Sequence, residues 1–396
     1  MRFRIGINYW PASKAMYWWR RFDSGEVRAD FERLRNAGFD SVRIFLLWED
    51  FQPRPDEVSE ASLCRLVSVA NVAADYGLSL IVTLFTGHMS GVNWLPEWAV
   101  VRGGRSPRFR TVSDGYVIDA APRNWYIDHA IRGAQALLAR EVARSLSKHP
   151  ALWAYDLGNE NSNCITPPSR EDAVAWLDTM ASAIRSEDPS HPITMGLHAE
   201  DLEEDRRLGP LEAARVCDFL SMHAYPMYLS WARSAADERV PAFLGLVTGF
   251  LGGREVLLQE FGAPAAASIP SASPVPVLEE ERAALFTCKA LQCIHESGLL
   301  GGMLWCFADY DASLWREPPL DRAAHERHFG IWRSDHSAKP CLSRLTRFAA
   351  QSPNKLTPHP DWIDMDRDVF YRDPAASLRH LYKRYCEVYR CEEAAC

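Results

Sequence analysis

The sequence predicts an α/β protein, a (β/α)8 TIM barrel with long loops after its strands and a helical C-terminal tail. Three observations support this prediction: eight short β-rich apolar runs, helix-like segments between them, and no linker that divides the series. Most runs are almost continuously apolar, which is typical of parallel strands buried on both faces. An open doubly wound sheet is the alternative, but the stretch "INYWPASK" lacks the glycine fingerprint expected after the first strand of that fold.

The predicted strands follow one another along most of the chain. They cover residues 4–10, 41–48, 79–86, 152–160, 193–198, 218–226, 256–262 and 301–309. Helix-like segments between them end at Gly38, Gly77 and Gly298, because glycine readily takes the left-handed conformation that ends a helix. Since no linker interrupts the series, we predict one barrel domain over residues 1–350.

Long loops after two of the predicted strands are rich in aromatic residues. They cover residues 87–135 and 309–335. Loops that follow the strands build the active face of a barrel, so we expect these two loops to shape a pocket. Their aromatic residues include Trp94, Trp98, Trp125, Tyr126, Tyr310, Trp315 and Trp332. The Ala/Ser/Pro-rich stretch 263–277 is predicted to be a mobile rim loop, because another strand follows it.

Residues 351–396 form the predicted helical C-terminal extension. Within it, Tyr382, Tyr385 and Tyr389 recur at intervals of three and four residues. This spacing places the three rings on one face of a helix, which we expect to pack on the barrel.

Composition and charge restrict the partners that this protein can bind. The net charge of -8, the pI near 5.9 and the absence of a basic run disfavour nucleic acid and anionic membrane surfaces. The chain carries 14 Trp and 13 Tyr, whose flat apolar faces and polar edges suit sugar rings. We therefore predict an oligosaccharide as the partner, and the sequence says nothing of the oligomeric state.

The sequence also predicts location and cofactors. No apolar run approaches the roughly 20 residues that span a bilayer, and "MRFRIGINYW" has no signal-peptide pattern. The ten cysteines lack framework spacing, and the steps of five between Cys386, Cys391 and Cys396 share no helical face. "HERH" and "GHMSG" match neither a zinc helix nor a nucleophile elbow. We expect a cytoplasmic protein with reduced thiols, no metal and no cofactor.

Polar and aromatic residues gather where the predicted strands end. Because these ends face one mouth of a barrel, the side chains should meet there. They are Arg43, His88, Asn159, Glu160, His223, Tyr225, Glu260 and Trp305. Two carboxylates on separate strands, Glu160 and Glu260, are the minimum equipment for hydrolysis of a glycosidic bond. Either Glu alone could equally cap a helix or form a salt bridge, so the pair carries the prediction.

The order of these eight residues resembles glycoside hydrolase family 5, whose barrel enzymes place an acid/base on the fourth strand and a nucleophile on the seventh. The resemblance covers roughly residues 4–350, which is nearly the whole predicted barrel. The stretches "FTGHMSGVNWLPEW" and "LWCFADYDASLW" are further similar to the β-mannosidases and β-mannanases of that family.

The resemblance implies a retaining, double-displacement mechanism. Glu260 is then the nucleophile and Glu160 the acid/base, with their carboxyl groups about 5 to 5.5 Å apart. We expect Arg43 and Tyr225 to keep Glu260 ionised. The negative charge of Glu260 should in turn raise the pKa of Glu160.

Other residues are implied as substrate contacts. Asn159 is expected to bind the sugar 2-hydroxyl, and Trp305 to lie beneath the reacting ring. For His88 and His223, a purely structural role is the alternative. Further candidates in the loops are Trp94, Trp98, Trp315, Glu49, Asp119, Asp309 and Asp311.

The predicted function is that of an exo-acting β-mannosidase, which releases terminal β-linked mannose from short oligosaccharides. Endo-β-1,4-mannanase and β-glucosidase activity are the alternatives among enzymes, each with possible transglycosylation. A carbohydrate-binding barrel without catalysis is the alternative from another class, but binding alone does not require a nucleophile and an acid.

Overall fold

The computed structural model describes residues 2–103, 108–268, 273, 275–351, 353–357 and 360–389. Eight parallel strands close into a barrel in the order β1-β16-β13-β12-β11-β10-β3-β2. The strands are β1 Arg4–Asn8, β2 Ser41–Phe45, β3 Ser79–Thr83, β10 Leu152–Asn159, β11 Ile193–His198, β12 Leu220–Ala224, β13 Val256–Phe261 and β16 Gly301–Leu304. Each lies within a predicted run, so the predicted fold class is confirmed and the open sheet is wrong.

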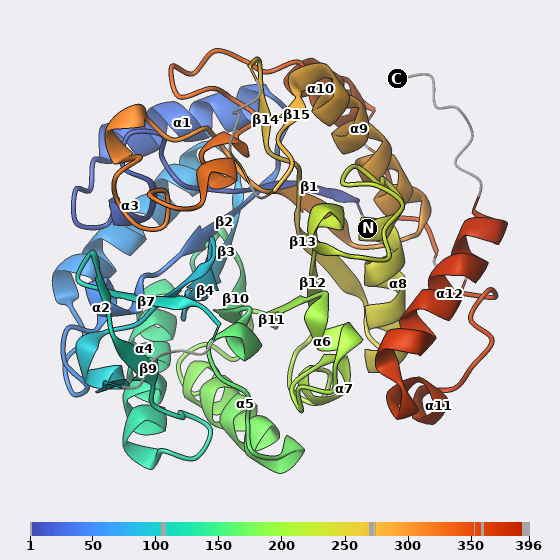
Figure 1. Cartoon of the computed structure of the whole chain (residues 1–396). Coiled ribbons are helices and arrows are strands. Elements are labelled where there is room, and N and C mark those ends of the chain that lie inside the picture. The colour runs from blue at the N-terminus through green and yellow to red at the C-terminus, as the bar shows by residue number, and fades with distance from the viewer. Residues whose placement is uncertain are drawn as a thin grey trace.

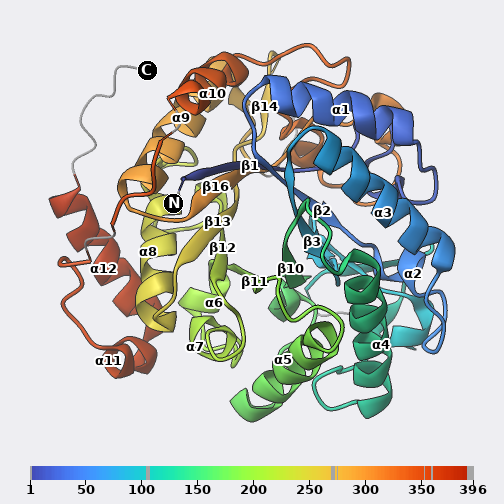
Figure 2. The same cartoon turned by 180° about the vertical axis from the view of Figure 1, so that it is seen from behind.

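Helices surround the strands as a ring (Figures 1 and 2). They are α1 Ser24–Asn36, α2 Trp48–Phe51, α3 Glu60–Asp75, α4 His129–Leu146, α5 Arg170–Arg185, α6 Glu200–Glu203, α7 Pro210–Ala213, α8 Val240–Gly252, α9 Glu280–Glu296 and α10 Cys341–Ala350. Gly38, Gly77 and Gly298 have φ of 92°, 63° and 71°, as expected for residues that end a helix. After β11 the long outer helix is replaced by the short helices α6 and α7.

The loop after β3 is more structured than predicted. Four short strands, β4 Gly87–Met89, β5 Val92–Trp94, β7 Arg110–Ser113 and β8 Tyr116–Ile118, form one small sheet. Strands β6 Val100–Arg102 and β9 Ala120–Pro122 pair in a second sheet. Strands of three or four residues are too short to give a clear periodic pattern, which explains why the sequence indicated only a loop.

Two further loops complete the active face. After β13, the strands β14 Ala265–Ala266 and β15 Leu278–Glu279 pair with each other. Residues 269–272 and 274 of the predicted rim loop lie outside the described residues. After β16, the chain forms the 3-10 helices η5 Ala312–Leu314 and η6 Ala324–His328.

The C-terminal helices α11 Arg367–Arg372 and α12 Pro374–Val388 lie beside α8 (Figures 1 and 2). The rings of Tyr382 and Tyr385 are buried, with centroids 4.9 Å and 5.6 Å from that of Phe243 on α8. The Tyr382 hydroxyl donates a hydrogen bond of 2.6 Å to Asp237 Oδ2. Tyr389 packs on Tyr385, with ring centroids 4.7 Å apart.

Within the described part of the chain, no helix is both long and apolar enough to cross a membrane. The eight cysteines in this part form no disulfide bond. Cys391 and Cys396 lie outside the described residues.

Candidate active site

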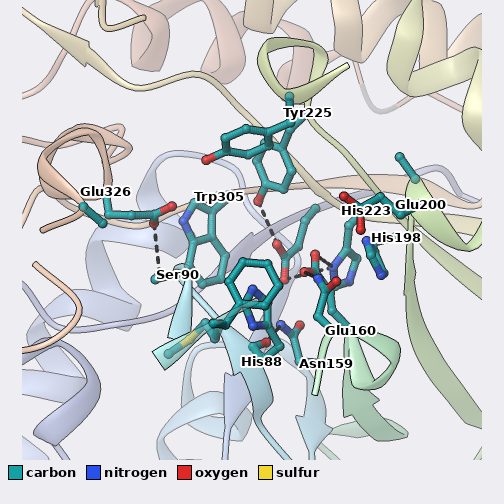
Figure 3. Close-up of a pocket in the computed structure, with 18 of the residues that line it drawn as sticks. His88, Ser90, Asn159, Glu160, His198, Glu200, His223, Tyr225, Trp305 and Glu326 are labelled. Carbon is teal, nitrogen blue, oxygen red and sulfur yellow. Dashed lines mark hydrogen bonds and ion pairs between the residues drawn. The ribbon is translucent and has the colours of Figure 1, made fainter. Parts of the chain in front are cut away.

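A cavity of about 390 Å³ lies at the carboxyl ends of the barrel strands (Figure 3). This volume is at the lower end of the range of small-molecule sites. The loops after β3, β12 and β16 wall the cavity. Seven of the predicted site residues line it: His88, Asn159, Glu160, His223, Tyr225, Glu260 and Trp305.

Glu160 lies at the end of β10 in the left-handed conformation, with φ of 49° and ψ of 44°. Few non-glycine residues adopt this conformation. The backbone holds it there, because Glu160 N donates to Gly196 O at 3.0 Å and Asn163 N donates to Glu160 O at 2.9 Å. Gly158 leaves room for the Asn161 side chain before this turn, since a Cβ there would lie 2.5 Å from Asn161 Oδ1. The sharp turn directs the Glu160 carboxylate into the cavity.

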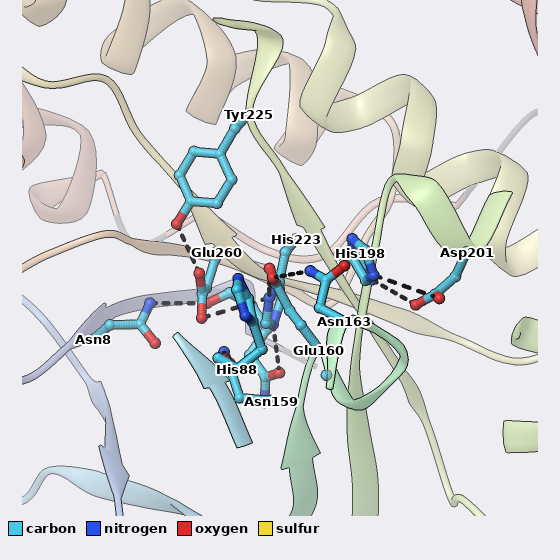
Figure 4. Close-up of polar contacts among 12 residues, drawn as sticks. Asn8, His88, Asn159, Glu160, Asn163, His198, Asp201, His223, Tyr225 and Glu260 are labelled. Carbon is cyan, nitrogen blue, oxygen red and sulfur yellow. Dashed lines mark hydrogen bonds and ion pairs between the residues drawn. The ribbon is translucent and has the colours of Figure 1, made fainter. Parts of the chain in front are cut away.

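Glu260, on β13, is held by Arg43 of β2 and by Tyr225, which directly follows β12; Figure 4 shows the Tyr225 contact. The Arg43 guanidinium lies 2.5 Å from Glu260 Oε1, and the Tyr225 hydroxyl donates a hydrogen bond of 2.7 Å to Glu260 Oε2. Arg43 is fully buried, and Glu260 is 4% exposed. Arg43 therefore lies behind the nucleophile candidate and does not line the cavity itself.

Asp156 completes the charge balance around Arg43, and the sequence did not identify it. The Arg43 guanidinium donates to Asp156 Oδ2 at 2.8 Å and 3.0 Å, and Thr83 donates to the same oxygen at 2.7 Å. Arg43 Nη2 also donates to Asn159 Oδ1 at 2.7 Å. Asp156 is fully buried. Its place within an apolar strand was a signal in the sequence, because a buried Asp is almost always paired with a charged partner.

His223 connects the two carboxylates. Its Nδ1 lies 2.9 Å from Glu160 Oε1 and 3.5 Å from Glu260 Oε1. Burial lowers the pKa of His223, but the charge of Glu260 and the hydrogen bond to Glu160 outweigh it and raise the pKa above its ordinary value. Burial raises the pKa of Glu160, but the His223 hydrogen bond and the charges of neighbouring histidines outweigh it and lower that pKa.

The expected direction of the pKa shift of Glu160 is therefore wrong. Burial and the charge of Glu160 raise the pKa of Glu260, although His223, Arg43 and Tyr225 oppose them. These shifts favour the imidazolium form of His223 beside an ionised Glu160. This state has the same number of protons as a neutral His223 beside a protonated Glu160, so the two groups titrate as a pair.

Three predicted contacts have well-defined surroundings. Asn159 donates to His88 O at 2.6 Å, and His88 Nδ1 lies 2.9 Å from Asn93 Oδ1. Trp305 is 4% exposed and lines the same cavity as Glu160 (Figure 3). Its ring packs edge-on against Phe45, with centroids 5.8 Å apart.

Two predicted substrate contacts, Trp94 and Trp315, do not line the cavity. Trp94 is 2% exposed and donates a hydrogen bond of 3.2 Å to Met89 O. Trp315 lies under the Arg327 guanidinium, 4.7 Å from the ring, and donates to Tyr310 O. Both indoles donate their hydrogen bonds within their own loops, and composition alone could not distinguish this from a place in the pocket. The other loop candidates, Trp98, Glu49, Asp119, Asp309 and Asp311, are also absent from the lining.

The sequence missed several residues that line the cavity. Asn163 donates to Glu160 Oε2 at 3.1 Å. His198, at the end of β11, lies 2.9 Å from Ser162 Oγ. Glu200 forms ion pairs with Arg108 and, at 2.5 Å, with Arg206. His198, which ends the fifth barrel strand, was the one feature of the sequence that could have indicated the residues on this side of the cavity.

Among the described residues, one group of three ligand-type side chains is close enough to hold a metal ion: Glu160, His223 and Glu260, whose ligand atoms lie within 4.8 Å of one another. The positive charge of Arg43, 2.5 Å from Glu260 Oε1, disfavours a second cation at that oxygen. The hydrogen bonds within the group instead suit proton transfer between its members.

A (β/α)8 barrel with two carboxylates in one cavity at its mouth is an arrangement typical of glycosidases. Comparison with known proteins gives the family. The model of the family described as Cellulase (glycosyl hydrolase family 5) matches residues 6–310. The chain belongs to glycosyl hydrolase family 5.

Individual relatives are distant. A putative mannan endo-1,4-beta-mannosidase of Oryza sativa subsp. japonica is 24% identical over 284 residues, which are 60% of this chain and 53% of that protein. A second rice protein, mannan endo-1,4-beta-mannosidase 4, is 22% identical over 239 residues, or 55% of this chain and 50% of that protein. This chain thus spans about half the length of the curated relatives it matches.

Solved structures share the fold over more of the chain. A GH5_18 protein from Streptomyces cattleya, solved in complex with GlcNAc, has a TM-score of 0.77 and 24% identity over 96% of this chain and 87% of that one. A variant of it was solved with Manb1-4GlcNAc. The exo-beta-1,4-mannosidase Op5Man5 from Opitutaceae bacterium strain TAV5 has a TM-score of 0.71 and 26% identity, over 88% of this chain and 59% of that one.

Proposed function

We propose that the protein is a retaining exo-β-mannosidase, which removes terminal β-linked mannose from short oligosaccharides. The observation that carries the proposal is the placement of Glu160 and Glu260 in one small cavity, with an oxygen of each within 4.8 Å of the other. Retaining glycosidases hold their two carboxyl groups about 5 to 5.5 Å apart, whereas inverting enzymes keep them about 6.5 to 9.5 Å apart to admit a water.

In the first step of the proposed reaction, Glu260 attacks the anomeric carbon and the glycosidic bond breaks. Before the bond breaks, His223 passes its proton to Glu160 through their 2.9 Å contact, and Glu160 gives that proton to the leaving oxygen. Glu160 is then ionised and ready to act as the base. Arg43 and Tyr225 stabilise the negative charge of Glu260 before it attacks, and again when Glu260 leaves the sugar in the second step.

In the second step, Glu160 accepts a proton from water, and the resulting hydroxide oxygen displaces Glu260 from the sugar. Trp305 supplies an apolar surface for the reacting ring. Asn159, whose oxygen accepts from Arg43 and whose nitrogen donates to His88 O, is held beside the 2-hydroxyl position that we assign to it. This rigid placement preorganises the contact for the transition state.

The relatives favour mannose as the sugar. Op5Man5 is described as an exo-beta-1,4-mannosidase, and the rice proteins as mannan endo-1,4-beta-mannosidases. The GH5_18 variant complex suggests Manb1-4GlcNAc as a disaccharide to test on this protein. The small volume of the cavity favours a terminal residue over an internal segment of a polymer.

A panel of substrates tests the proposal. We expect turnover of nitrophenyl β-mannoside and of Manβ1-4GlcNAc, at least about tenfold less turnover of nitrophenyl β-glucoside, and little release from mannan polymer. The glucoside should be slower because its epimeric 2-hydroxyl would leave a buried polar partner unsatisfied, which costs about 1–3 kcal/mol. Rapid depolymerisation of mannan with no release from small mannosides would instead establish endo-β-1,4-mannanase activity, which the rice relatives make the second candidate.

Other outcomes of the same panel separate the remaining candidates. Preferred cleavage of the β-glucoside identifies a β-glucosidase. Longer products at high substrate concentration reveal transglycosylation. Tight oligosaccharide binding with no turnover indicates a carbohydrate-binding barrel.

A further inference from the structure

Two sequence motifs that match no known catalytic pattern meet in the wall of the cavity. Ser90, from "GHMSG", lies at the tip of the β4–β5 hairpin, where Ser90 and Gly91 have φ of 54° and 77°. Glu326, from "HERH", lies in η6. Ser90 Oγ donates a hydrogen bond of 2.9 Å to Glu326 Oε2, and both residues line the cavity. We call this contact the Ser90–Glu326 bridge.

The bridge joins the loops after β3 and β16 on one side of the cavity. In Figure 3, Trp305 lies between the bridge and Glu160, whereas His198 and Glu200 lie on the far side of Glu160. A sugar above Trp305 would therefore have its reacting carbon toward the carboxylates and its opposite end toward the bridge. In a β-1,4-linked chain, that opposite end carries the 4-hydroxyl, where a longer chain would continue.

Glu326 has an oxygen available for this end of the sugar. Oε2 accepts from Ser90, whereas Oε1 accepts no hydrogen bond from any described residue; His325 Nε2 lies 3.4 Å away and pairs with the Tyr228 hydroxyl at 2.9 Å. Glu326 is 7% exposed, so its carboxylate is largely desolvated. A hydrogen bond from a sugar hydroxyl to a carboxylate in such surroundings is among the stronger ones.

The same wall holds a second unpaired polar atom. His325 Nδ1 is buried and has no hydrogen-bond partner within the described residues. Buried polar groups in proteins are nearly always paired, so an exception calls for an explanation.

We infer that Glu326 binds the 4-hydroxyl of the terminal sugar, and that the Ser90–Glu326 bridge ends the cleft behind this sugar. The bridge then determines specificity, because it excludes a substrate that continues beyond the 4-hydroxyl. This inference rests on the proposed exo-glycosidase function and names the residues that make the action exo.

The first experiment compares the Glu326→Ala and Glu326→Gln variants with wild type. With nitrophenyl β-mannoside, we expect kcat/KM to fall by about 10- to 100-fold in Glu326→Ala, the loss expected for a hydrogen bond to a charged group, and by less in Glu326→Gln. With the 4-deoxy analogue, wild type and Glu326→Ala should differ by less than about threefold, because the analogue lacks the group that Glu326 binds. Equal losses on both substrates would contradict the inferred contact.

The second experiment follows the products from mannotetraose. Wild type should release single mannose units, whereas Ser90→Ala/Glu326→Ala should also release mannobiose from the non-reducing end. Glu317→Ala, an exposed residue of the same loop, is the matched control and should behave as wild type. Thermal unfolding of each variant confirms that it is folded.

The outcomes distinguish this inference from the proposed function. If the wild type and the double variant both release only single mannose units, the proposed exo-mannosidase function stands, but the bridge is not the end wall of the cleft. A wild type that releases glucose from cellotetraose overturns mannose as the sugar, and the variants then test the bridge on that substrate. Internal cleavage by wild type, or no cleavage of either tetrasaccharide, overturns both.

Discussion

Glu260→Ala should lower kcat on nitrophenyl β-mannoside by about 10⁴-fold or more, as expected when a covalent nucleophile is removed. Glu260 is the carboxylate that Arg43 and Tyr225 hold in place at 2.5 Å and 2.7 Å, so no described neighbour can replace it without moving. The measurement is the initial rate at saturating substrate, with circular dichroism to confirm the fold. Full activity in this variant would contradict the assignment of the nucleophile.

Two controls make this result specific. Glu255→Ala removes an exposed Glu just before β13 and should retain wild-type activity. Azide should restore turnover to Glu260→Ala and yield the α-mannosyl azide, because the small anion attacks from the face that the carboxylate has left. A β-azide product would show that another nucleophile acts first.

Arg43→Met should lower the free energy of unfolding by about 3–5 kcal/mol, because it leaves two buried carboxylates without their counter-charge. Asp156 is fully buried and Glu260 is 4% exposed, and both pair with the Arg43 guanidinium. The midpoint of urea unfolding measures the effect. Activity should also fall steeply, since the pKa of Glu260 would rise further once the positive charge is gone.

Arg28→Met is the matched control for this prediction. Arg28 pairs with Asp75 at 2.9 Å on the surface, where both side chains are about half exposed. Exposed ion pairs contribute little to stability, so the midpoint should hardly change. If Arg43→Met unfolded at the wild-type midpoint, the buried network would not have the structural role described here.

The barrel and its carboxylate pair could be predicted because they depend on repeated, local patterns. Apolar runs and helix-ending glycines mark each strand and helix, and strand ends place Glu160 and Glu260 at one mouth whatever the side-chain detail. The short strands of the β3 loop could not be predicted in this way. Their pairing depends on contacts between segments that are each too short to carry a period.

Residues that act through specific contacts were harder to identify. Asp156 and Asn163 adjoin the "NE" at 159–160, yet their roles depend on which side chains they reach, at 2.8 Å and 3.1 Å. A charged residue within the apolar run "LWAYDL" was a usable signal for a buried partner. Trp94 and Trp315 were predicted as substrate contacts but do not line the cavity. An aromatic residue in a loop fits a core and a sugar site equally well, so the sequence could not decide between them.

The proton position also required the structure. A sequence places Glu160 and Glu260 near each other, but it does not show that His223 lies 2.9 Å from Glu160 and changes which group holds the proton. The paired titration of Glu160 and His223 follows from this one contact.

The most direct test of the proposed function is proton NMR of mannotetraose during the first minutes of hydrolysis by the wild-type enzyme, before the anomers equilibrate. A retaining exo-β-mannosidase predicts that the first products are mannose, as its β-anomer, and mannotriose. If mannose appeared first as its α-anomer, the retaining mechanism would be wrong, and if mannobiose were the first product, the exo action would be wrong.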